Sequence, residues 1–329
     1  MGGRRTNLAL LFLLALAFLT GWLAFAFFGW PSRLVLVVHA LAGIGLLLLV
    51  PWKSLIARRA LSRRRRPRVW WASLLLGLGL AISLAFGFLH SAGRWYVGGD
   101  LTAMEFHVGA AICILPFAVW HVLARPLRVR RAEVAALLTR RSFLRLGAFG
   151  AAAAGALLVL PQARRSPSGS YELGSFAPAE MPGTQWMFDS VPVVSGDAAV
   201  LSVGGRRVGY GELARFSDTV RCQLDCTGGW YATQDWEGVW LSRLLGPAPA
   251  WARSILVRSV TGYSRRFPVE SLPALLLAVR AGSLPLDPAH GFPARLVAPG
   301  RRGFWWVKWV SSVEFDALPD WWQPPFPLQ

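Results

Sequence analysis

Residues 289–315 read AHGFPARLVAPGRRGFWWVKWVSSVEF. The stretch lies in a half of the chain that is rich in Gly and Pro and contains short β-like runs such as AVLSVGG and SILVRSV. Short runs separated by turn residues are typical of strands. We therefore expect a mixed α+β domain, mostly β, over 175–329, with some helix, for example at 270–281.

The sequence before residue 163 has a different character, because it contains five apolar runs: 7–30, 33–52, 69–90, 101–124 and 143–161. Each is close to the ~20 residues that cross a bilayer as a helix. The runs are apolar all round, whereas helices of a soluble core keep a polar face. We expect an all-α five-helix transmembrane bundle over 1–162, and a polar linker over 163–174.

The formal net charge of +18 is concentrated in the pair Arg4 and Arg5 and in the segments 53–68 and 125–145. A nucleic-acid interface would need a basic patch on a folded surface, so we exclude nucleic acid as a partner. Basic segments between membrane helices lie in the cytoplasm. This pattern predicts a multi-pass protein of the bacterial cytoplasmic membrane, with the N-terminus inside and the domain after residue 162 outside.

The hexapeptide Thr139-Arg140-Arg141-Ser142-Phe143-Leu144 leads into the fifth apolar run. This hexapeptide resembles the twin-arginine export consensus, whose pathway carries folded proteins. The resemblance implies the twin-arginine translocase as a partner and a cofactor loaded in the cytoplasm. The alternative is a pair of ordinary cytoplasmic arginines that flank a fifth helix.

Four of the five histidines lie in the apolar half, at His39, His90, His107 and His121. Ionisable groups in membrane helices are costly and usually functional, and paired imidazoles on facing helices hold b-type haem. At 1.5 Å per residue, His39 and His107 each lie ~9 Å from the outer end of their helix. We predict that these two ligate one haem b in a cytochrome-b-like bundle. His90 is a substitute ligand, His121 is either a ligand or an interfacial residue, and a haem-free anchor is the alternative for the whole bundle.

Three stretches of the second half, 221–245, 259–272 and 289–315, resemble the molybdopterin-binding domain of the sulfite oxidase family in motif, order and spacing. The resemblance covers about 175–318. It implies that family's fold and a molybdenum–molybdopterin cofactor.

In that family one cysteine thiolate ligates molybdenum, as suits a soft sulfur donor. Cys226, followed by Thr-Gly-Gly-Trp, matches its position, so the resemblance makes Cys226 the metal ligand and the catalytic residue. Cys222 is the competitor, and a Cys222–Cys226 disulfide would remove the ligand. Cys113, within an apolar run, is expected to serve packing.

The resemblance further implies that His290, Arg295 and Lys308 bind the cofactor. Arg forks two bonds to phosphate, while Lys acts as a point charge. Glycine permits the backbone at 300–303, and Gly303 within it, to approach the cofactor. Many relatives carry a second lysine where this chain has Trp305.

Sulfite oxidases follow the cysteine with an arginine-bearing segment, but here no Lys or Arg follows Cys226 for sixteen residues. The domain is in this respect similar to periplasmic methionine sulfoxide reductase catalytic subunits. We expect oxygen-atom transfer on a small-molecule or peptide-bound substrate, with electrons from the quinone pool. The alternatives are sulfite oxidation, with charge from Arg265 or Arg266, and a pterin-binding protein without turnover. The aromatics Trp230, Tyr231 and Trp236 either line a substrate pocket or belong to the core.

Overall fold

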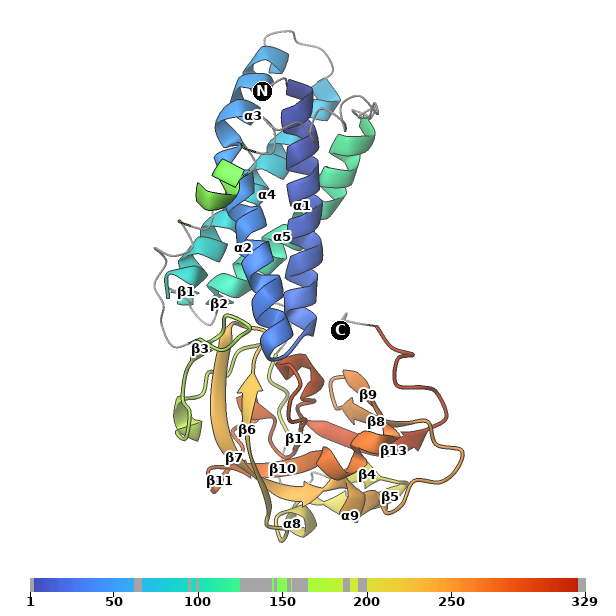
Figure 1. Cartoon of the computed structure of the whole chain (residues 1–329). Helices are drawn as coiled ribbons and strands as arrows, with labels where there is room; N and C mark the ends of the chain where they lie inside the picture. Colours follow the sequence, from blue (N-terminus) through green and yellow to red (C-terminus); the bar gives the residue numbers. More distant parts are fainter. Residues whose placement is uncertain are drawn as a thin grey trace. The chain divides into compact units, whose positions relative to one another are not determined.

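The computed structural model describes residues 3–61, 67–93, 96–98, 101–124, 144, 147–152, 155, 165–185, 190–194 and 200–324. The chain divides into an N-terminal unit, residues 1–24 and 30–163, and a C-terminal unit, residues 25–29 and 164–329. Figure 1 shows helices in the first unit and mainly strands in the second.

Four helices of the described N-terminal unit are long and apolar enough to cross a membrane. They are α1 (Gly3–Ala26), α2 (Trp30–Leu48), α4 (Pro67–Ser91) and α5 (Ala103–Ala124). They coincide with the first four predicted runs. Most of the fifth run, with Arg140 and Arg141, lies outside the described residues, so the fifth helix stays a prediction.

Within the described part of the N-terminal unit, helix α3 (Val50–Leu61) was not predicted. It covers the end of the second run and the start of a basic segment. Helix α2 ends at Leu48, and Pro51 lies in the first turn of α3. Proline is tolerated in a first turn, where its missing N–H would have no intrahelical partner. The last turn carries Arg58 and Arg59, whose charges suit a helix C-terminus.

Helix α5 begins at a capping box that follows the short hairpin of β1 (Tyr96–Gly98) and β2 (Leu101–Thr102). The Glu105 carboxylate accepts from the Thr102 N–H at 2.7 Å, and the Glu105 N–H donates to the Thr102 hydroxyl at 3.2 Å. The two side chains satisfy donors that have no intrahelical partner. Helix α5 packs on α4, where Phe86 and Phe106 stack with their ring centroids 4.6 Å apart.

The C-terminal unit is built on two mixed sheets (Figure 1). The first contains β3 (Tyr171–Glu172), β6 (Asp218–Asp225), β7 (Trp230–Trp240), β10 (Leu276–Ala281), β11 (Leu284–Pro285) and β12 (Arg295–Val297). Strands β6 and β10 flank β7, and β12 pairs with β10. Strand β3 runs parallel to β7, and the other pairs of this sheet are antiparallel.

The second sheet has the order β5 (Arg206–Gly209), β4 (Val200–Val203), β13 (Val310–Asp316), β8 (Ser254–Ser259) and β9 (Ser264–Pro268). Its β4–β13 pair is parallel. The described helical segments of this unit are short: η1 (Pro178–Glu180), α8 (Tyr210–Leu213), α9 (Leu241–Leu245), η2 (Val269–Ala274), η3 (Pro288–His290) and η4 (Gly303–Trp305). The predicted mixed and mainly β class is confirmed.

The helix predicted at 270–281 is wrong. Residues 269–274 form the 3-10 turn η2, which contains Pro273, and residues 276–281 form strand β10. Every residue of β10 except Arg280 is buried. A short apolar run buried on both faces has no alternation that would distinguish a strand from a helix. The pairing of β10 with both β7 and β12 decides for the strand.

Candidate functional site

The turn after β6 presents the thiol of Cys226. The backbone N–H of Cys226 donates to the carbonyl of Trp230 at 2.8 Å, and the carbonyl of Cys226 accepts from the Gly229 N–H at 3.2 Å. Gly229 has a φ of 94°, which a residue with a side chain rarely adopts. The turn therefore needs glycine there. The Sγ atom accepts from the Gly228 N–H at 3.4 Å and lies 3.5 Å from the Thr184 hydroxyl.

The competing thiol, Cys222, lies within β6 and has a different environment. Burial raises its pKa to about 12, although the nearby Arg295 charge acts in the opposite direction. A thiolate is the form that ligates a metal, so this environment disfavours Cys222 as a ligand. The structure contains both cysteines as free thiols, without the disulfide. Cys113 is also free and lies exposed on α5.

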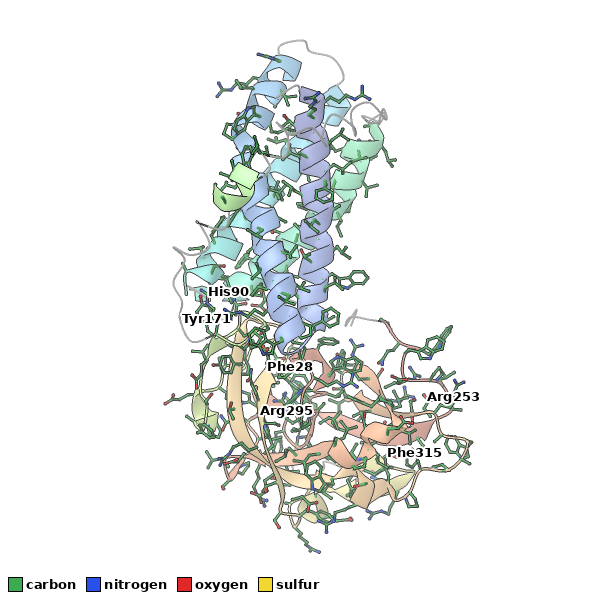
Figure 2. The ribbon with its side chains drawn as sticks, viewed as in Figure 1. Phe28, His90, Tyr171, Arg253, Arg295 and Phe315 are labelled. Atoms are coloured by element: carbon green, nitrogen blue, oxygen red, sulfur yellow. The ribbon has the colours of Figure 1, made fainter. Side chains whose placement is uncertain are left out.

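Arg295, at the start of β12, has a fully buried guanidinium (Figure 2). Its charged carbon lies 5.1 Å from the ring centroid of Trp236 and 5.6 Å from that of Trp306. The Nε and Nη1 atoms have no hydrogen-bond partner among the described residues. Burial lowers the Arg295 pKa to about 10, while the proximity of Cys226 and Cys222 opposes that shift. A buried cation with unpaired donors is costly, so this position fits an anionic group.

His290 and Lys308 lie close to Arg295, because Gly291 lets their segments meet. A Cβ at Gly291 would lie 3.1 Å from the Cβ of Arg295 and 3.2 Å from the Cα of Lys308. Burial lowers the pKa of His290 to about 4, with help from the charges of Arg295 and Lys308. His290 is therefore neutral at pH 7. Lys308 donates to the carbonyls of Ala289, at 2.9 Å, and of Thr184, at 3.3 Å.

Gly303 allows a further close approach, this time to Cys226 itself. A Cβ at this position would lie 3.0 Å from the Cα of Cys226 and 3.1 Å from the Asp225 carbonyl oxygen. Gly303 opens the short 3-10 turn η4 that precedes Lys308. The structure thus brings the turns of residues 226–229 and 300–303 together at the thiol.

Thr184 connects these groups and was not found by sequence reasoning. Its hydroxyl lies beside the Cys226 sulfur and accepts from the Trp230 indole N–H at 2.8 Å, while its carbonyl accepts from Lys308. No motif surrounds Thr184, and 42 residues separate it from Cys226. Only the folded chain places it there.

Residues 191–320 match a family model described as the oxidoreductase molybdopterin binding domain. The matched residues make up most of the C-terminal unit, which thus contains a domain of the molybdopterin-binding type. The enzyme class predicted from the sequence, a molybdopterin-dependent oxidoreductase, is confirmed.

Among solved structures, the chain is similar to the sulfane dehydrogenase SoxCD from Paracoccus pantotrophus, at 25% identity and a TM-score of 0.37. The match covers 39% of this chain and 40% of the length of that one. No curated protein matches the chain.

The residues around the thiol fit the cofactor of such a domain. Arg295 offers unpaired buried donors for an anion, and Lys308 adds a second positive charge. Gly291 and Gly303 leave space that a side chain would fill. Trp305, which replaces a lysine of many relatives, contacts Arg301, whose charged carbon lies 4.7 Å from its ring centroid.

Two of the three aromatics considered for a substrate pocket belong to the core. Trp230 and Trp236 are buried, and Trp236 packs on Arg295. Tyr231 is partly exposed on β7. The two indoles therefore position groups of the cofactor site rather than lining an open cavity.

The two arginines considered for sulfite already have partners within the molybdopterin-binding domain. Arg265 is buried and donates to the Tyr263 hydroxyl and to the Pro324 carbonyl, each at 2.8 Å. Arg266 forms a 2.9 Å ion pair with Asp316. Neither geometry favours the role of an anion-binding substrate residue.

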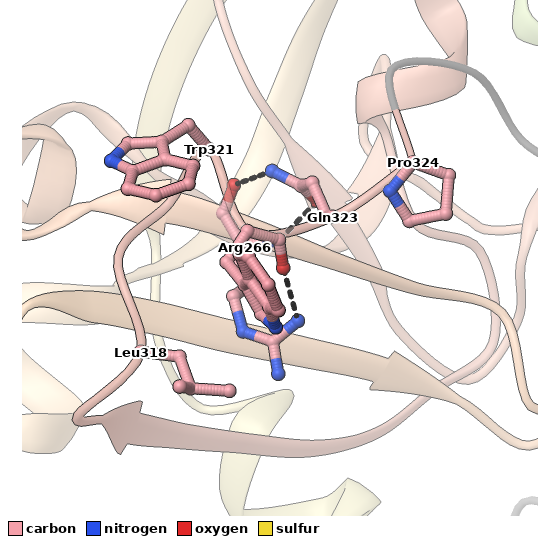
Figure 3. A pocket seen from close by; sticks show the side chains of 6 residues that line it. Arg266, Leu318, Trp321, Gln323 and Pro324 are labelled. Carbon is pink, nitrogen blue, oxygen red and sulfur yellow. Dashed lines mark hydrogen bonds between the residues drawn. The ribbon is translucent and has the colours of Figure 1, made fainter.

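Arg266 also lines a surface hollow, shown in Figure 3 with Leu318, Trp321, Trp322, Gln323 and Pro324. The Gln323 amide exchanges hydrogen bonds with the backbone of Arg266, and the guanidinium donates to the Trp322 carbonyl. The hollow shares no residue with the cluster around Cys226. Its polar groups are engaged with one another, so we assign it no ligand.

In the N-terminal unit, the imidazoles of His39 and His107 meet edge to face, with ring centroids 5.7 Å apart. Nδ1 of His39 lies 2.9 Å from the Ala17 carbonyl oxygen, and Nδ1 of His107 lies 2.7 Å from that of Ser83. A carbonyl only accepts, so each Nδ1 carries the proton and each Nε2 is the unprotonated nitrogen of a neutral imidazole. This is the arrangement that ligating histidines adopt.

Glycines make room for both rings. A Cβ at Gly21 would lie 3.0 Å from Cε1 of His39, and a Cβ at Gly87 would lie 2.9 Å from Nδ1 of His107. The other two histidines are placed differently. His90 lies buried near the end of α4, and Nδ1 of His121 lies 2.9 Å from the Ser73 hydroxyl.

Proposed function

We propose that this protein is a membrane-anchored molybdenum–molybdopterin oxidoreductase that transfers an oxygen atom to or from its substrate beside Cys226. The observation that carries the proposal is the buried guanidinium of Arg295, with two donor atoms that no described residue pairs, in a domain of the molybdopterin-binding type. Such a group needs an anionic partner, which the phosphate of the cofactor provides.

Each residue of the site has a role in this proposal. The Cys226 thiolate ligates molybdenum, and the N–H of Gly228 and the hydroxyl of Thr184 hold its sulfur. Arg295, Lys308 and the neutral His290 bind the pterin and its phosphate. When bound, the molybdenum centre supplies two-electron oxygen-atom transfer.

The proposed substrate is a neutral oxygen donor or acceptor of the sulfoxide class, free or within a peptide. No lysine or arginine follows Cys226 for sixteen residues, and Arg265 and Arg266 are engaged elsewhere. A sulfite-oxidising site would need a free cation for its anionic substrate. Sulfite oxidation is the second candidate, supported only by the family resemblance.

The electron partner in this proposal is the quinone pool, reached through one haem b held by His39 and His107. The unprotonated Nε2 atoms and the facing rings support this ligand pair. Haem b supplies one-electron transfer, which links a two-electron site to a quinone. The positive-inside pattern supports a molybdopterin-binding domain on the outer face of the cytoplasmic membrane.

Metal analysis of the full-length protein, purified from its native membrane, tests the proposal. We expect one molybdenum per chain and an organic pterin. The Cys226→Ser variant should lose activity, because a hydroxyl is a much poorer ligand, whereas Cys222→Ser should remain largely active. Protein without molybdenum would support a pterin-binding protein without turnover, and exchanged behaviour of the two variants would reassign the ligand.

The haem is tested by optical absorption of the same preparation, from cells with ample haem supply. His39→Ala and His107→Ala should each abolish the Soret band, and His121→Ala should spare most of it. If His90→Ala removes the band while His39→Ala does not, the ligands are His90 and His107. A wild-type protein without a Soret band would make the helices a haem-free anchor.

A further inference from the structure

Asp225, the residue directly before Cys226, has a carboxylate that is only 1% exposed and is surrounded by donors. Its Oδ2 accepts from the hydroxyls of Ser168, at 2.6 Å, and of Ser166, at 3.1 Å. Its Oδ1 accepts from the Ser170 hydroxyl at 2.7 Å and from Nη1 of Arg302. Four donors from two distant segments thus meet at one carboxylate.

The three serines come from the segment that sequence reasoning assigned to a polar linker. They are buried, with exposed fractions of 6, 8 and 1% for Ser166, Ser168 and Ser170. A tight turn directs the hydroxyls to one side, since the Ser166 N–H donates to the Ser170 carbonyl at 2.9 Å and Gly169 adopts a φ of 85°. The segment is therefore packed into the C-terminal unit, whose main part begins at Arg164.

The carboxylate also holds the second turn of the site in place. Arg302 is buried and precedes Gly303, where an added Cβ would lie 3.0 Å from the Cα of Cys226. The ion pair between Arg302 and Asp225 therefore fixes the 300–303 turn at the thiol. The serine segment continues to Tyr171, whose N–H donates to the Gly229 carbonyl at 3.0 Å, on the other side of the Cys226 turn.

We propose that Asp225 is a positioning residue for the Cys226 thiolate, held by a clamp of Ser166, Ser168, Ser170 and Arg302. The inference rests on the proposed role of Cys226 as the molybdenum ligand. The Asp225 carboxylate accepts from four donors in this buried network, so the loss of its charge weakens all four bonds and loosens both turns. The orientation of the sulfur then changes even where the domain stays folded.

The test compares Asp225→Asn with Glu237→Gln in the full-length protein. Asparagine keeps the size of Asp225, but it loses the charge and one acceptor oxygen. Glu237 is a matched control, because it is a partly buried acid of the same sheet that pairs with Arg280 at 2.6 Å. Asp225 pairs with Tyr231 on β7, and Glu237 lies six residues after Tyr231 on the same strand. At 3.3 Å per residue, Glu237 is therefore ~20 Å from the Asp225 pair.

Two measurements report on the thiol. The first is the rate at which iodoacetamide alkylates Cys226 in cofactor-free protein, followed by peptide mass spectrometry. We expect Asp225→Asn to raise this rate ~10-fold, as one lost charge-assisted hydrogen bond predicts, and Glu237→Gln to leave it unchanged. The second is the Mo(V) electron paramagnetic resonance signal of the loaded protein, which should shift only in Asp225→Asn at equal molybdenum content.

The outcomes are distinct. If Asp225→Asn lowers thermal stability but changes neither the alkylation rate nor the Mo(V) signal, the clamp is structural only and the inference is overturned. If the wild type binds no molybdenum, the proposed function fails, but the alkylation rate still decides the role of Asp225. Should Asp225→Asn fail to fold, Ser168→Ala keeps the carboxylate but removes its 2.6 Å bond from Ser168 together with the contacts of that hydroxyl to Ser166 and Ser170. An unchanged alkylation rate in this variant would equally refute the clamp.

Discussion

At the scale of the residue, the buried Arg295 guanidinium indicates the binding of an anionic group. Its guanidinium is buried between two indoles, and two of its donor atoms are unpaired within the described chain. An uncompensated buried charge destabilises a domain by several kcal/mol. The cofactor-free domain therefore keeps an unfavourable group that only an anionic ligand can compensate.

We accordingly predict that Arg295→Met raises the thermal stability of the cofactor-free protein and lowers its affinity for the cofactor. The cofactor-free protein should become more thermally stable, because a residue of similar length without a charge replaces the unpaired guanidinium. Cofactor retention should fall ~10- to 100-fold, as the loss of charged hydrogen bonds worth about 1.5–3 kcal/mol implies. Differential scanning calorimetry and pterin content after gel filtration measure the two effects. A destabilised apoprotein that retains its pterin would contradict this account.

His290 gives the domain a pH dependence with a definite sign. Its pKa is about 4 in the folded protein against an ordinary value of 6.5, because burial and two nearby cations disfavour its charged form. The unfolded chain binds the extra proton first, so stability is complete above pH 6.5 and is lost as the pH falls towards 4. Between pH 7 and pH 5 this single group should cost about 2 kcal/mol.

The measurement is hydrogen exchange of the β10 amides in cofactor-free protein, at pH 7 and pH 5, corrected for the intrinsic exchange rates. His290→Gln removes the titrating group. Between pH 7 and pH 5 the free energy of unfolding of this variant should therefore fall by about 2 kcal/mol less than that of the wild type. An equal loss in wild type and variant would assign the pH dependence to other groups.

At the scale of elements, two turns form the site, and their approach depends on the absence of a side chain at Gly303. Gly303→Ala would place a methyl group 3.0 Å from the Cα of Cys226, which is backbone and cannot move aside as a flexible side chain would. We predict a destabilisation of about 1–3 kcal/mol from overpacking and a loss of bound molybdenum.

Gly211→Ala is the matched control, because a Cβ there would meet nothing within 4 Å. Gly211 lies in the short helix α8, where alanine is the better helix former. This variant should keep its stability and its molybdenum content, as measured by thermal unfolding and metal analysis. Molybdenum retained in Gly303→Ala would show that the two turns can separate without harm to the site.

At the scale of the whole molecule, the chain combines helices long and apolar enough to cross a bilayer with a domain that matches the molybdopterin-binding family. The arginine pair at 140 and 141 lies between the two, at the start of the fifth apolar run. A domain that receives its cofactor in the cytoplasm has to cross the membrane already folded. The pair therefore has a predicted role in export that the first four apolar helices do not need.

Replacing Arg140 and Arg141 together by lysine tests this role. The charge, and with it the positive-inside signal, is unchanged, while the twin-arginine pattern is lost. We predict that the molybdopterin-binding domain then stays in the cytoplasm, protected from protease added to spheroplasts. A domain that remains accessible to the protease would leave the arginines only a topological role.

The sequence by itself determined the features that depend on local composition and on specific motifs. Uninterrupted apolar length predicted the first four membrane-spanning helices, because crossing a bilayer requires little more than such length. The HGFPxRLVxPG motif and the Cys226 turn predicted the enzyme class, because these residues are adjacent in the chain and rarely occur together by chance.

Only the tertiary structure decided what depends on contacts between distant segments. Thr184 contacts Cys226 across 42 residues of sequence, and the serines at 166 and 170 contact Asp225 across more than 50. No local sequence pattern predicts either contact. The run at 276–281 became a strand because two neighbouring strands satisfy its backbone, a choice that its uniform hydrophobicity leaves open. A hydrogen-bonded site is fixed by which groups meet after folding, whereas a hydrophobic span is fixed by the residues it contains.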